Sequence, residues 1–535
     1  MNSDLHCHPS LKATLQRRFN NGDGNIWRNY KTQLDEVFKK ESHVTSILKD
    51  LIYLDSQSNL QKCVQGKVKV VFFAIYPIER SFFRKIVGIN GLLSVNKAIS
   101  VLTGLPLDKV GAYRNNEKFG VDYYKDYQFE LETILLKENQ SFKDSNGVKW
   151  NFKIPKNKTE YQQYLNEQNT IIGVLTVEGG HSFGDYEGKK IFRKNKFNKE
   201  YSPYLYPTED NNSDINNNSE LKHLRKSLLN NIEATKKSAH PPLFLTLGHH
   251  FNNLICGHAK SFKGALGMLL NQKALLGLGI TTIGNEVIDL LLDDSIGKRI
   301  LIDIKHMSIQ ARHELYKKQQ YKNNKTPIVS SHSSVSGIDT LANASNIINS
   351  NKKEKRFLAQ QEIGLTDEEI KTIFLSKGLI GICLHEGRMP GKRFKQLKKE
   401  YQRNREATKE LNLFYCLFIS TLLHIMKVQK EILGTQEGES RKIWSGIGVG
   451  TDYDGIVDPF DNVQTLKDLD LFKQGIKQYI QLAYSGDPDY WVVDPCTDEN
   501  VDVENIKSLF DINELDNLID DVFFNNTHSF IINNL

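Results

Sequence analysis

Short apolar segments rich in β-branched and aromatic residues recur along the whole chain, with polar loops or helical periodicity between them. Eight such segments are present, at residues 3–8, 69–76, 170–178, 243–249, 299–306, 327–332, 379–385 and 447–452. Strands that alternate with helices are typical of repeated βα units and a parallel sheet. The pattern therefore predicts an α/β fold, and the number of strands predicts a (β/α)₈ TIM barrel.

Residues that bind metals or transfer protons stand at the carboxyl ends of seven of these eight segments. They are His6 with His8, Glu178, His249, His306, His332, His385 and Asp452. In a (β/α)₈ barrel the active site lies at the carboxyl ends of the strands and takes residues from several of them. The positions thus predict a barrel of the metal-dependent hydrolase type.

Long loops interrupt the pattern. We expect a single catalytic domain over residues 1–535 with insertions at about 84–169, 185–240 and 337–362. The first is long enough for helices and a cap-like subdomain, and the second contains a polar run typical of a mobile segment. The basic stretch 391–406 is interpreted as a solvated helix face, and the apolar stretch 411–426 as a buried helix too short to span a membrane.

Composition excludes several classes of protein. Seventy Lys and Arg residues against 64 Asp and Glu give a net charge of only +6 over 535 residues, so we expect no nucleic-acid partner. The six cysteines are scattered without a CxxC pair, which argues against a disulfide framework and a zinc ribbon. No secretory signal precedes the first strand, so we expect a cytoplasmic protein without a membrane partner.

The strongest chemical signal is a set of metal-ligand residue types. The alternation of a strand places His6 and His8 on one side, with Cys7 facing away. Glu178 precedes Gly179 and Gly180, so a carboxylate able to bridge two cations stands beside a sharp turn. Histidines also end the fifth and sixth strands. Each motif alone is equally compatible with a structural role, and only their combination predicts a metal site.

Asp452 lies at the end of the last predicted strand, within Gly446-Ile-Gly-Val-Gly-Thr-Asp452. A carboxylate opposite the metal ligands suits a proton carrier between a water nucleophile and a leaving group. The glycine spacing is not that of a dinucleotide-binding loop, because no helix start and ribose-binding acid follow it at the required places.

Five motifs, VEGGHS, LTLGHH, the segment from GLGITTIGNEV to IDIKHMS, PIVSSHSS and GVGTDYDG, occur in the order found in the membrane dipeptidase (renal dipeptidase) family of the amidohydrolase superfamily. The chain resembles this family from the first strand to the last, outside the insertions. The resemblance implies two zinc ions bridged by Glu178. It also implies that His6 and His8 bind one ion and that His306 and His332 bind the other. His249 then contacts the substrate carbonyl, with His250 as the alternative, and Asp452 is the catalytic acid.

The chain departs from the family pattern at two places. The family has HxD in its first strand, where this chain has His6-Cys7-His8. The family also has an arginine soon after the SSHSS motif that binds the carboxylate of a dipeptide, and none follows here before Arg356. Arg388, after the seventh strand, is a second candidate because a guanidinium binds a carboxylate through two parallel hydrogen bonds.

These inferences predict a zinc-dependent hydrolase that cleaves the amide bond of a dipeptide or similar small acyl-amino compound through a hydroxide held by two metal ions. An enzyme of the same superfamily acting on another amide, a lactone or an ester is the first alternative. A catalytically inactive barrel with a binding role is the second. The expected partner is the small-molecule or dipeptide substrate, and a homodimer is left open.

Overall fold

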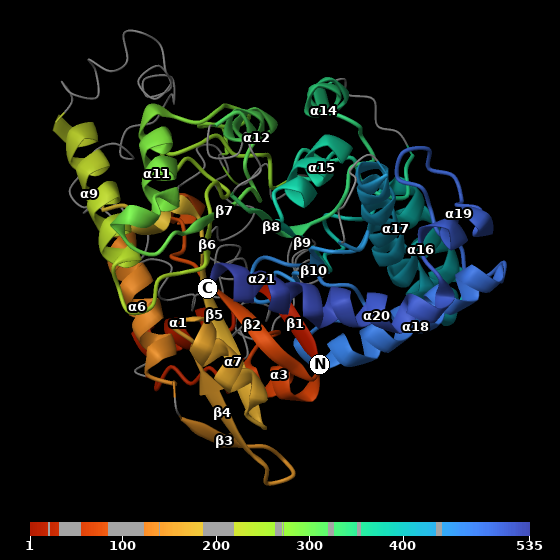
Figure 1. Ribbon diagram of the computed structural model, residues 1–535, viewed down its shortest axis with the longest axis horizontal. Helices are drawn as coiled ribbons and strands as arrows, with labels where there is room; N and C mark the ends of the chain where they lie inside the picture. Colours follow the sequence, from red (N-terminus) through yellow and green to blue (C-terminus); the bar gives the residue numbers. More distant parts are fainter. Residues whose placement is uncertain are drawn as a thin grey trace, which may run out of the picture.

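A barrel of eight parallel strands forms the centre of the computed structural model, which describes residues 1–19, 22–30, 55–83, 122–138, 140–185, 219–262, 270, 272–318, 326–349, 355–434 and 441–535 (Figure 1). The strands, in spatial order, are β1 (Asn2–Cys7), β2 (Val68–Ile75), β5 (Thr170–Glu178), β6 (Phe244–Thr246), β7 (Leu301–Asp303), β8 (Ile328–Ser333), β9 (Leu379–Ile382) and β10 (Ile447–Val449). A parallel bridge between Cys7 and Tyr453 brings the last strand back to the first. The predicted (β/α)₈ fold is confirmed.

All eight predicted strands are present, and several are shorter than predicted. β6, β7 and β10 have three residues each, because the chain leaves the ladder before it reaches His249, His306 and Asp452. His306 and Asp452 adopt left-handed backbone conformations, with φ of 66° and 61°. Such conformations are uncommon for residues other than glycine and end a strand abruptly.

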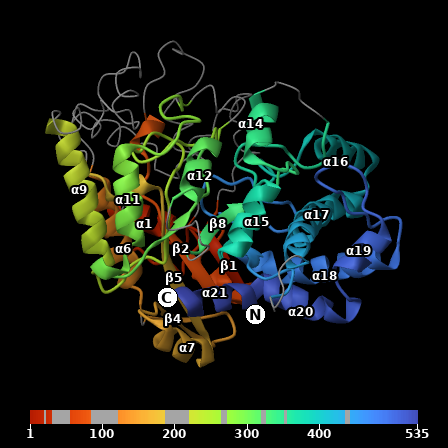
Figure 2. The same ribbon diagram turned by 45° about the horizontal axis from the view of Figure 1, so that its top comes forward.

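Helices surround the barrel, and the two views place α6, α9 and α11 on one side and α16 to α20 on the other (Figures 1 and 2). The α-helices are α1 (Leu11–Phe19), α3 (Leu60–Gln65), α6 (Tyr123–Leu135), α7 (Lys158–Asn166), α9 (Ser219–Lys236), α11 (Thr282–Leu292), α12 (Ile309–Tyr316), α14 (Leu341–Asn349), α15 (Asp367–Leu375), α16 (Lys392–Asn404), α17 (Ala407–Leu433), α18 (Leu469–Ser485), α19 (Val503–Leu509), α20 (Leu515–Asp520) and α21 (Asn526–Asn534). Short 3₁₀ turns are η1 (Arg80–Phe83), η2 (Gly180–Phe183), η5 (Asp294–Ile296), η6 (Leu466–Asp468) and η7 (Ile512–Glu514), and the π-helical turn η8 (Asp521–Asn525) precedes α21.

The hydrophobic core has two main parts. One fills the barrel interior and includes Leu5, Phe72, Phe244 and the C-terminal Ile531. The other, much larger, lies between the outer face of the strands and the helices. This division is expected of a barrel, where inward and outward side chains alternate along each strand.

The insertions are partly described. Residues 84–121, 186–218 and 350–354 lie outside the described residues, so the expected cap and the mobile segment are not located. The sequence analysis missed a hairpin of β3 (Ser141–Lys143) and β4 (Lys149–Lys153), in which β4 pairs with the first residues of β5. These two strands are short and largely polar, so they carry little hydrophobic signal.

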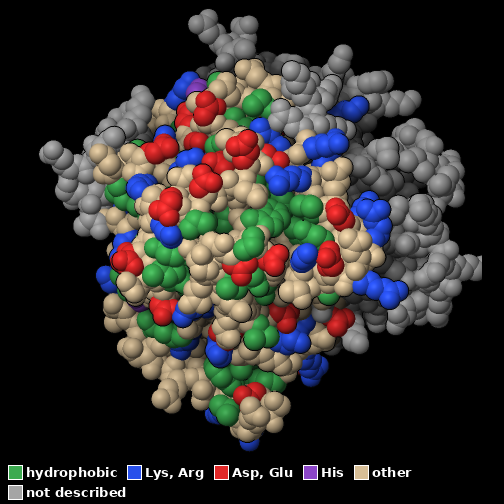
Figure 3. Space-filling model, turned by 90° about the vertical axis from the view of Figure 1, so that its right-hand side faces the viewer, with side chains coloured by type: hydrophobic (Ala, Val, Ile, Leu, Met, Phe, Trp, Pro, Cys, Tyr) green, Lys and Arg blue, Asp and Glu red, His purple; other side chains and the backbone are tan. Residues whose placement is uncertain are grey.

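The basic stretch forms α16, in which only Phe394 is buried, as expected for a solvated helix. Acidic and basic side chains are interspersed on the face of the molecule that carries this helix (Figure 3). The apolar stretch forms α17, which is longer than predicted and has the length and composition of a membrane span. Within the structure, 78% of its most apolar window is buried, as in a core helix.

Candidate metal centre

Potential metal ligands gather at the carboxyl ends of the strands. Their ligand atoms form two groups, each with all atoms within 4.8 Å of one another, and the groups share Glu178. The first group is His6, Glu178, His332 and Asp452; the second is Glu178, His249 and His306. All of these side chains are buried. The barrel therefore brings residues from six strands to one shared carboxylate.

The distances within this cluster fit a divalent ion. Five histidine Nε2 atoms lie 3.1–3.9 Å from a Glu178 oxygen: those of His8 at 3.1, His6 at 3.4, His249 at 3.4, His306 at 3.5 and His332 at 3.9 Å. Ligands about 2.1 Å from a tetrahedral ion are separated by roughly 3.4 Å. His6 Nε2, His8 Nε2 and Glu178 Oε1 are also buried without a hydrogen-bond partner. Because buried polar atoms are normally paired, these atoms are suited to hold an ion.

The other ring nitrogen of most of these histidines is held by the protein. His8 Nδ1 lies 2.8 Å from Ala74 O, His332 Nδ1 lies 2.9 Å from Ser331 Oγ, and His306 Nδ1 lies 3.3 Å from Ser261 Oγ. Such partners fix the orientation of a metal-binding imidazole and leave Nε2 free to bind. Each of these three contacts at Nδ1 thus orients its ring so that Nε2 faces Glu178.

The grouping differs in part from the pairing implied by the family resemblance. His6 shares its group with His332, and their ring centroids are 4.2 Å apart, because β1 and β8 contact one another across the barrel. His306 and His332 remain neighbours, with 3.2 Å between their Nε2 atoms. His8 belongs to neither group, yet its Nε2 lies 3.5 Å from Asp452 Oδ1.

Two buried aspartates brace the strand ends that carry the cluster. Asp4 accepts hydrogen bonds from His6 N and from the backbone and hydroxyl of Thr451, so it ties β1 to the end of β10. Asp303 accepts hydrogen bonds from Lys305 N and from the backbone and hydroxyl of Ser331, so it ties β7 to β8. Burial raises the pKa of Asp4 to about 6 against these hydrogen bonds.

A glycine makes the turn after Glu178. Gly179 has φ of 91°, and a Cβ atom there would lie 2.3 Å from the His181 ring. Its backbone N–H donates to Thr246 O on β6. The glycine that the sequence places after the acid is therefore required by both the backbone and the close approach of His181.

Glu79 is a site residue that the sequence analysis missed. Its Oε2 lies 2.6 Å from His249 Nδ1 and accepts a hydrogen bond from the Tyr76 hydroxyl at 3.2 Å. Burial lowers the pKa of His249, but the carboxylates of Glu178 and Glu79 outweigh burial and raise this pKa to about 9. Glu79 follows β2 by four residues, and its place just beyond a strand end is the signal that could have found it.

The histidines of the cluster differ in their affinity for protons. Burial lowers the pKa of His306 and His332 well below the ordinary value, which favours the neutral imidazole that binds metals. Burial also acts on His8, but the Asp452 and Glu178 carboxylates raise its pKa well above the ordinary value. An ion bound at His8 would displace this proton, so metal binding there is expected to weaken at low pH.

The two candidate arginines lie in different surroundings. Arg388 is buried close to the cluster, and its positive charge contributes to the lowered pKa of His250 and His306. Arg356 Nη1 instead donates to the carbonyls of Pro495 and Cys496 at 3.0 and 2.9 Å. These two hydrogen bonds direct Nη1 of Arg356 to backbone groups of that turn, and a role of Arg356 in substrate binding stays a prediction.

His250 and Lys305 complete the surroundings of the cluster. The His250 ring lies against His249, with 3.7 Å between ring centroids, so His249 is the histidine of LTLGHH that reaches Glu178. Burial, followed by the Arg388 guanidinium, lowers the pKa of Lys305 to about 8. His385, at the end of β9, is held neutral because burial and Arg388 lower its pKa to about 3.

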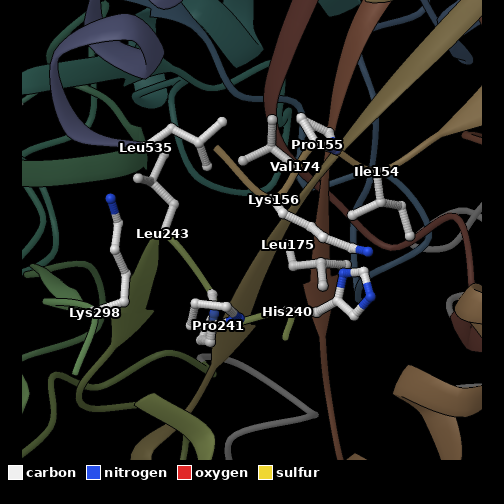
Figure 4. Close-up of a pocket in the computed structure, with 11 residues that line it drawn as sticks. Ile154, Pro155, Lys156, Val174, Leu175, His240, Pro241, Leu243, Lys298 and Leu535 are labelled. Carbon is white, nitrogen blue, oxygen red and sulfur yellow. The ribbon is translucent and has the colours of Figure 1, made fainter. Parts of the chain in front are cut away.

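A separate pocket lies at the amino ends of β6 and β7, beside the C-terminal Leu535 (Figure 4). Its lining includes Val174, Leu243, Lys298 and Leu535 and contains none of the clustered ligands. Amino-end positions of a (β/α)₈ barrel contribute to stability rather than catalysis. The candidate site is therefore the cluster at the opposite end.

No protein-family model and no curated protein matches the chain. Among solved structures it is similar to the metallopeptidase dipeptidase AC, at 12% identity and a TM-score of 0.43 over 98% of both chains. It is similar to a metallopeptidase from Rhodobacter sphaeroides with a phosphinate mimic of the dipeptide L-Ala-D-Ala, at 12% identity and a TM-score of 0.46 over 100% of this chain and 98% of that one. It is also similar to the probable dipeptidase PvdM from Pseudomonas aeruginosa, at 12% identity and a TM-score of 0.40 over 90% and 88%. The chemistry proposed below rests on the residues of this chain.

Proposed function

We propose that the protein is a hydrolase that uses two divalent ions, zinc by the character of the ligands, to cleave the amide bond of a dipeptide or similar small acyl-amino compound. The observation that carries the proposal is the shared carboxylate of Glu178, around which five buried histidines gather; His6, His8, His306 and His332 are the proposed ligands, and His249 is left for the substrate. Imidazole and carboxylate ligands in this number suit zinc. When bound, such ions supply a water nucleophile at neutral pH and polarise the substrate carbonyl.

Asp452 is the proton carrier in this proposal. Its Oδ1 lies 3.5 Å from His8 Nε2 and its Oδ2 lies 3.8 Å from His332 Nε2, so the carboxylate stands at the edge of the cluster. The residue is 5% exposed, and its left-handed backbone turns it away from the β10 ladder. A carboxylate in this place can accept a proton from water and deliver it to the departing amine.

His249 orients and stabilises the reacting carbonyl oxygen in this proposal. Its Nε2 faces Glu178, and Glu79 holds its Nδ1, so the ring has one fixed orientation. The raised pKa favours the protonated imidazolium, which donates a hydrogen bond to developing negative charge. Loss of one such donor typically costs about 10²- to 10³-fold in rate.

The decisive experiment compares wild type with Glu178→Gln and Asp452→Asn. Elemental analysis of protein purified without chelator is expected to give two ions per chain in wild type and at least one fewer in Glu178→Gln. Asp452→Asn is expected to keep the fold while losing most turnover in a screen of dipeptides and acyl-amino acids.

Glu130→Gln is the matched control, since Glu130 is also a buried glutamate but belongs to neither ligand group. This variant is expected to keep the full metal content. Wild-type protein that binds no divalent ion, or Asp452→Asn that hydrolyses a verified substrate at the wild-type rate, would contradict the proposal.

A further inference from the structure

A third group of potential metal ligands lies among the outer helices. Asp367, His424 and Cys496 each offer one ligand atom, and these atoms lie within 4.8 Å of one another, as in the two groups around Glu178. Asp367 is the first residue of α15, His424 lies within α17, and Cys496 lies in the segment between α18 and α19. α15 and α17 pack against each other (Figures 1 and 2). The group therefore joins three elements and contains none of the residues proposed for catalysis.

His424 is the buried member of this group. Its Nε2 lies 2.7 Å from Asp367 Oδ1, and its Nδ1 is buried without a hydrogen-bond partner. A hydrogen bond between two packed helices explains the pair of Asp367 and His424 by itself. It does not explain why a thiol lies beside the pair, or why the second ring nitrogen is unpaired, since buried polar atoms are normally hydrogen-bonded.

A braced turn holds Cys496 beside this pair. Its backbone N–H donates to Asp494 Oδ1 at 2.7 Å, and its carbonyl accepts a hydrogen bond from Arg356 Nη1 at 2.9 Å. Phe357 N donates to Asp498 Oδ1 at 2.6 Å, at the other end of the same turn. Because the turn is fixed at both ends, little conformational entropy is lost when the thiol binds a ligand.

Negative charge surrounds the thiol. Burial, followed by the carboxylates of Asp367 and Asp494, raises the pKa of Cys496 to about 12. Asp494 pairs with Lys427 at 2.9 Å, whereas Asp367 faces His424. A nucleophilic cysteine needs a lowered pKa, so these surroundings do not suit a Cys–His–Asp catalytic triad. They suit a cation, because a metal ion displaces the thiol proton and is attracted by the same carboxylates.

We propose that Asp367, His424 and Cys496 form a third metal site, which takes a zinc-like divalent ion and ties α15 and α17 to the segment before α19. Thiolate, imidazole and carboxylate are all zinc ligands, and three of them leave one tetrahedral position to water. Ligands of such an ion are separated by roughly 3.4 Å. The Asp367 and His424 side chains therefore move slightly apart when the ion replaces the proton between them.

The third site is expected to bind its ion more weakly than the cluster around Glu178. Asp367 and Cys496 are only partly buried, whereas the side chains of the cluster are buried. The ion at the third site can therefore exchange with solvent during purification. It adds a third ion per chain only when divalent metal is supplied afterwards.

Titration with Co²⁺ tests the third site without any measurement of hydrolysis. A thiolate bound to Co²⁺ absorbs in the near ultraviolet by charge transfer, and the two ligand groups around Glu178 contain no sulfur. Chelator-treated wild type is expected to develop this absorption band, up to one thiolate-bound ion per chain. Cys496→Ser is expected to lose the band. Glu178→Gln is expected to keep it, so the result does not depend on the proposed function.

Cys416→Ser is the matched control for the loss of a thiol. Cys416 is another free cysteine, on the same helix as His424, and its Sγ lies 3.7 Å from Ser420 Oγ. It belongs to no ligand group of the described residues, so this variant is expected to keep the band. Wild type that develops no band, or a band that persists in Cys496→Ser, would overturn the third site.

Asp367→Asn separates metal binding from the hydrogen bond between the helices. Asparagine can still accept a hydrogen bond from His424 Nε2, but it lacks the charge that attracts a cation. We expect the metal-free variant to unfold at nearly the wild-type temperature and its affinity for Co²⁺ at the thiolate to fall at least about 10-fold. Wild-type affinity in this variant would show that Asp367 is a structural contact only, and would overturn the site.

Discussion

Glu79 and His249 form the closest link between the cluster and the protein around it. Glu79 accepts the His249 Nδ1 hydrogen bond through Oε2 and the Phe251 backbone N–H through Oε1. Burial alone would raise the pKa of Glu79, but the nearby His249 lowers it, so the carboxylate stays ionised. The raised pKa of His249 therefore favours a protonated ring held between Glu79 and Glu178.

Glu79→Gln is predicted to separate two effects of Glu79 on His249: the orientation of the ring by a hydrogen bond and the rise in its pKa caused by the negative charge. Glutamine can still accept the hydrogen bond, but it removes the negative charge that raises the pKa of His249, so less imidazolium is present at neutral pH. We expect kcat/KM to fall about 10- to 100-fold with metal content unchanged at saturating Zn²⁺. The measurement is the rate against pH, whose upper limit should move to lower pH. A variant with wild-type rates across the pH range would show that the charge is not used.

At the scale of single residues, the sequence predicted the residues of the cluster better than the residues that orient them. Strands with a clear hydrophobic pattern carry these residues at or just beyond their carboxyl ends, so the barrel rule places them together: His6, Glu178, His306, His332 and Asp452. Glu79 lies four residues beyond β2, and its partner His249 is 170 positions away in sequence. No local pattern connects them, because the pairing of β2 and β6 on either side of β5 brings the ends of these two strands together.

The loops after β9 and β10 form the element that carries Arg388. His385 Nδ1 lies 3.1 Å from Asp458 O, and the same carbonyl accepts a hydrogen bond from Glu386 N at 2.7 Å. Lys398 of α16 binds Glu386 at 2.8 Å and Asp461 at 2.7 Å. Lys398 thus forms ion pairs with two of three neighbouring acids, which are Glu386, Asp458 and Asp461.

Asp458 forms no ion pair with any residue that the structure describes, and its burial makes the stability of this element depend on pH. Burial, followed by Glu386, raises the pKa of Asp458 from 3.8 to about 7. Between about pH 4 and 7 the folded protein holds a proton that the unfolded chain releases, so this group lowers stability as pH rises and its full penalty is present above pH 7. Below pH 4 the penalty is absent.

Asp458→Asn is therefore predicted to raise the unfolding temperature at pH 8 and to change it little at pH 4. Thermal unfolding of wild type and variant at both values is the measurement. Asp461→Asn, which removes an acid paired with Lys398, is the control and should not stabilise the protein at pH 8. An equal shift of the Asp458 variant at both pH values would contradict the assignment of the penalty to ionisation.

Elements were predictable where hydrophobic patterning was strong. The eight barrel strands were found, whereas β3 and β4 were not, because Ser141–Lys143 and Lys149–Lys153 are partly or fully exposed except at Phe152. α17 was found but ended too early in the prediction, since its last turns, through Lys427 and Lys430, are polar on one face while Val428 and Ile432 remain buried. Strand ends differed because positive φ angles at His306 and Asp452 are set by the closed barrel and not by local sequence.

At the scale of the whole molecule, the residues proposed for catalysis and the C-terminal residues that stabilise the fold lie at opposite ends of the barrel. The potential metal ligands around Glu178 lie at the carboxyl ends of the strands, while the C-terminal segment closes the amino ends. Ser3 Oγ donates to Phe523 O, and Asn526 Nδ2 donates to the carbonyls of Trp444 and Ile447. Phe530 and Ile531 join the interior cluster of Leu5 and its neighbours. The last residues of the chain are thus part of the barrel core.

Ile531→Ala is predicted to destabilise the fold and spare the site. Ile531 is fully buried, so its truncation removes apolar contacts and leaves a cavity, at a cost of about 2–5 kcal/mol in the free energy of unfolding. Chemical denaturation followed by fluorescence measures this cost, and Ile347→Ala, at a 39%-exposed isoleucine on α14, is the matched control expected to change it little. Well below the unfolding temperature, the Ile531 variant should bind the same number of ions as wild type, because the cluster lies at the other end of the barrel. Loss of metal in a folded Ile531 variant would show that the two ends are coupled, and that the closed amino end also positions the ligands.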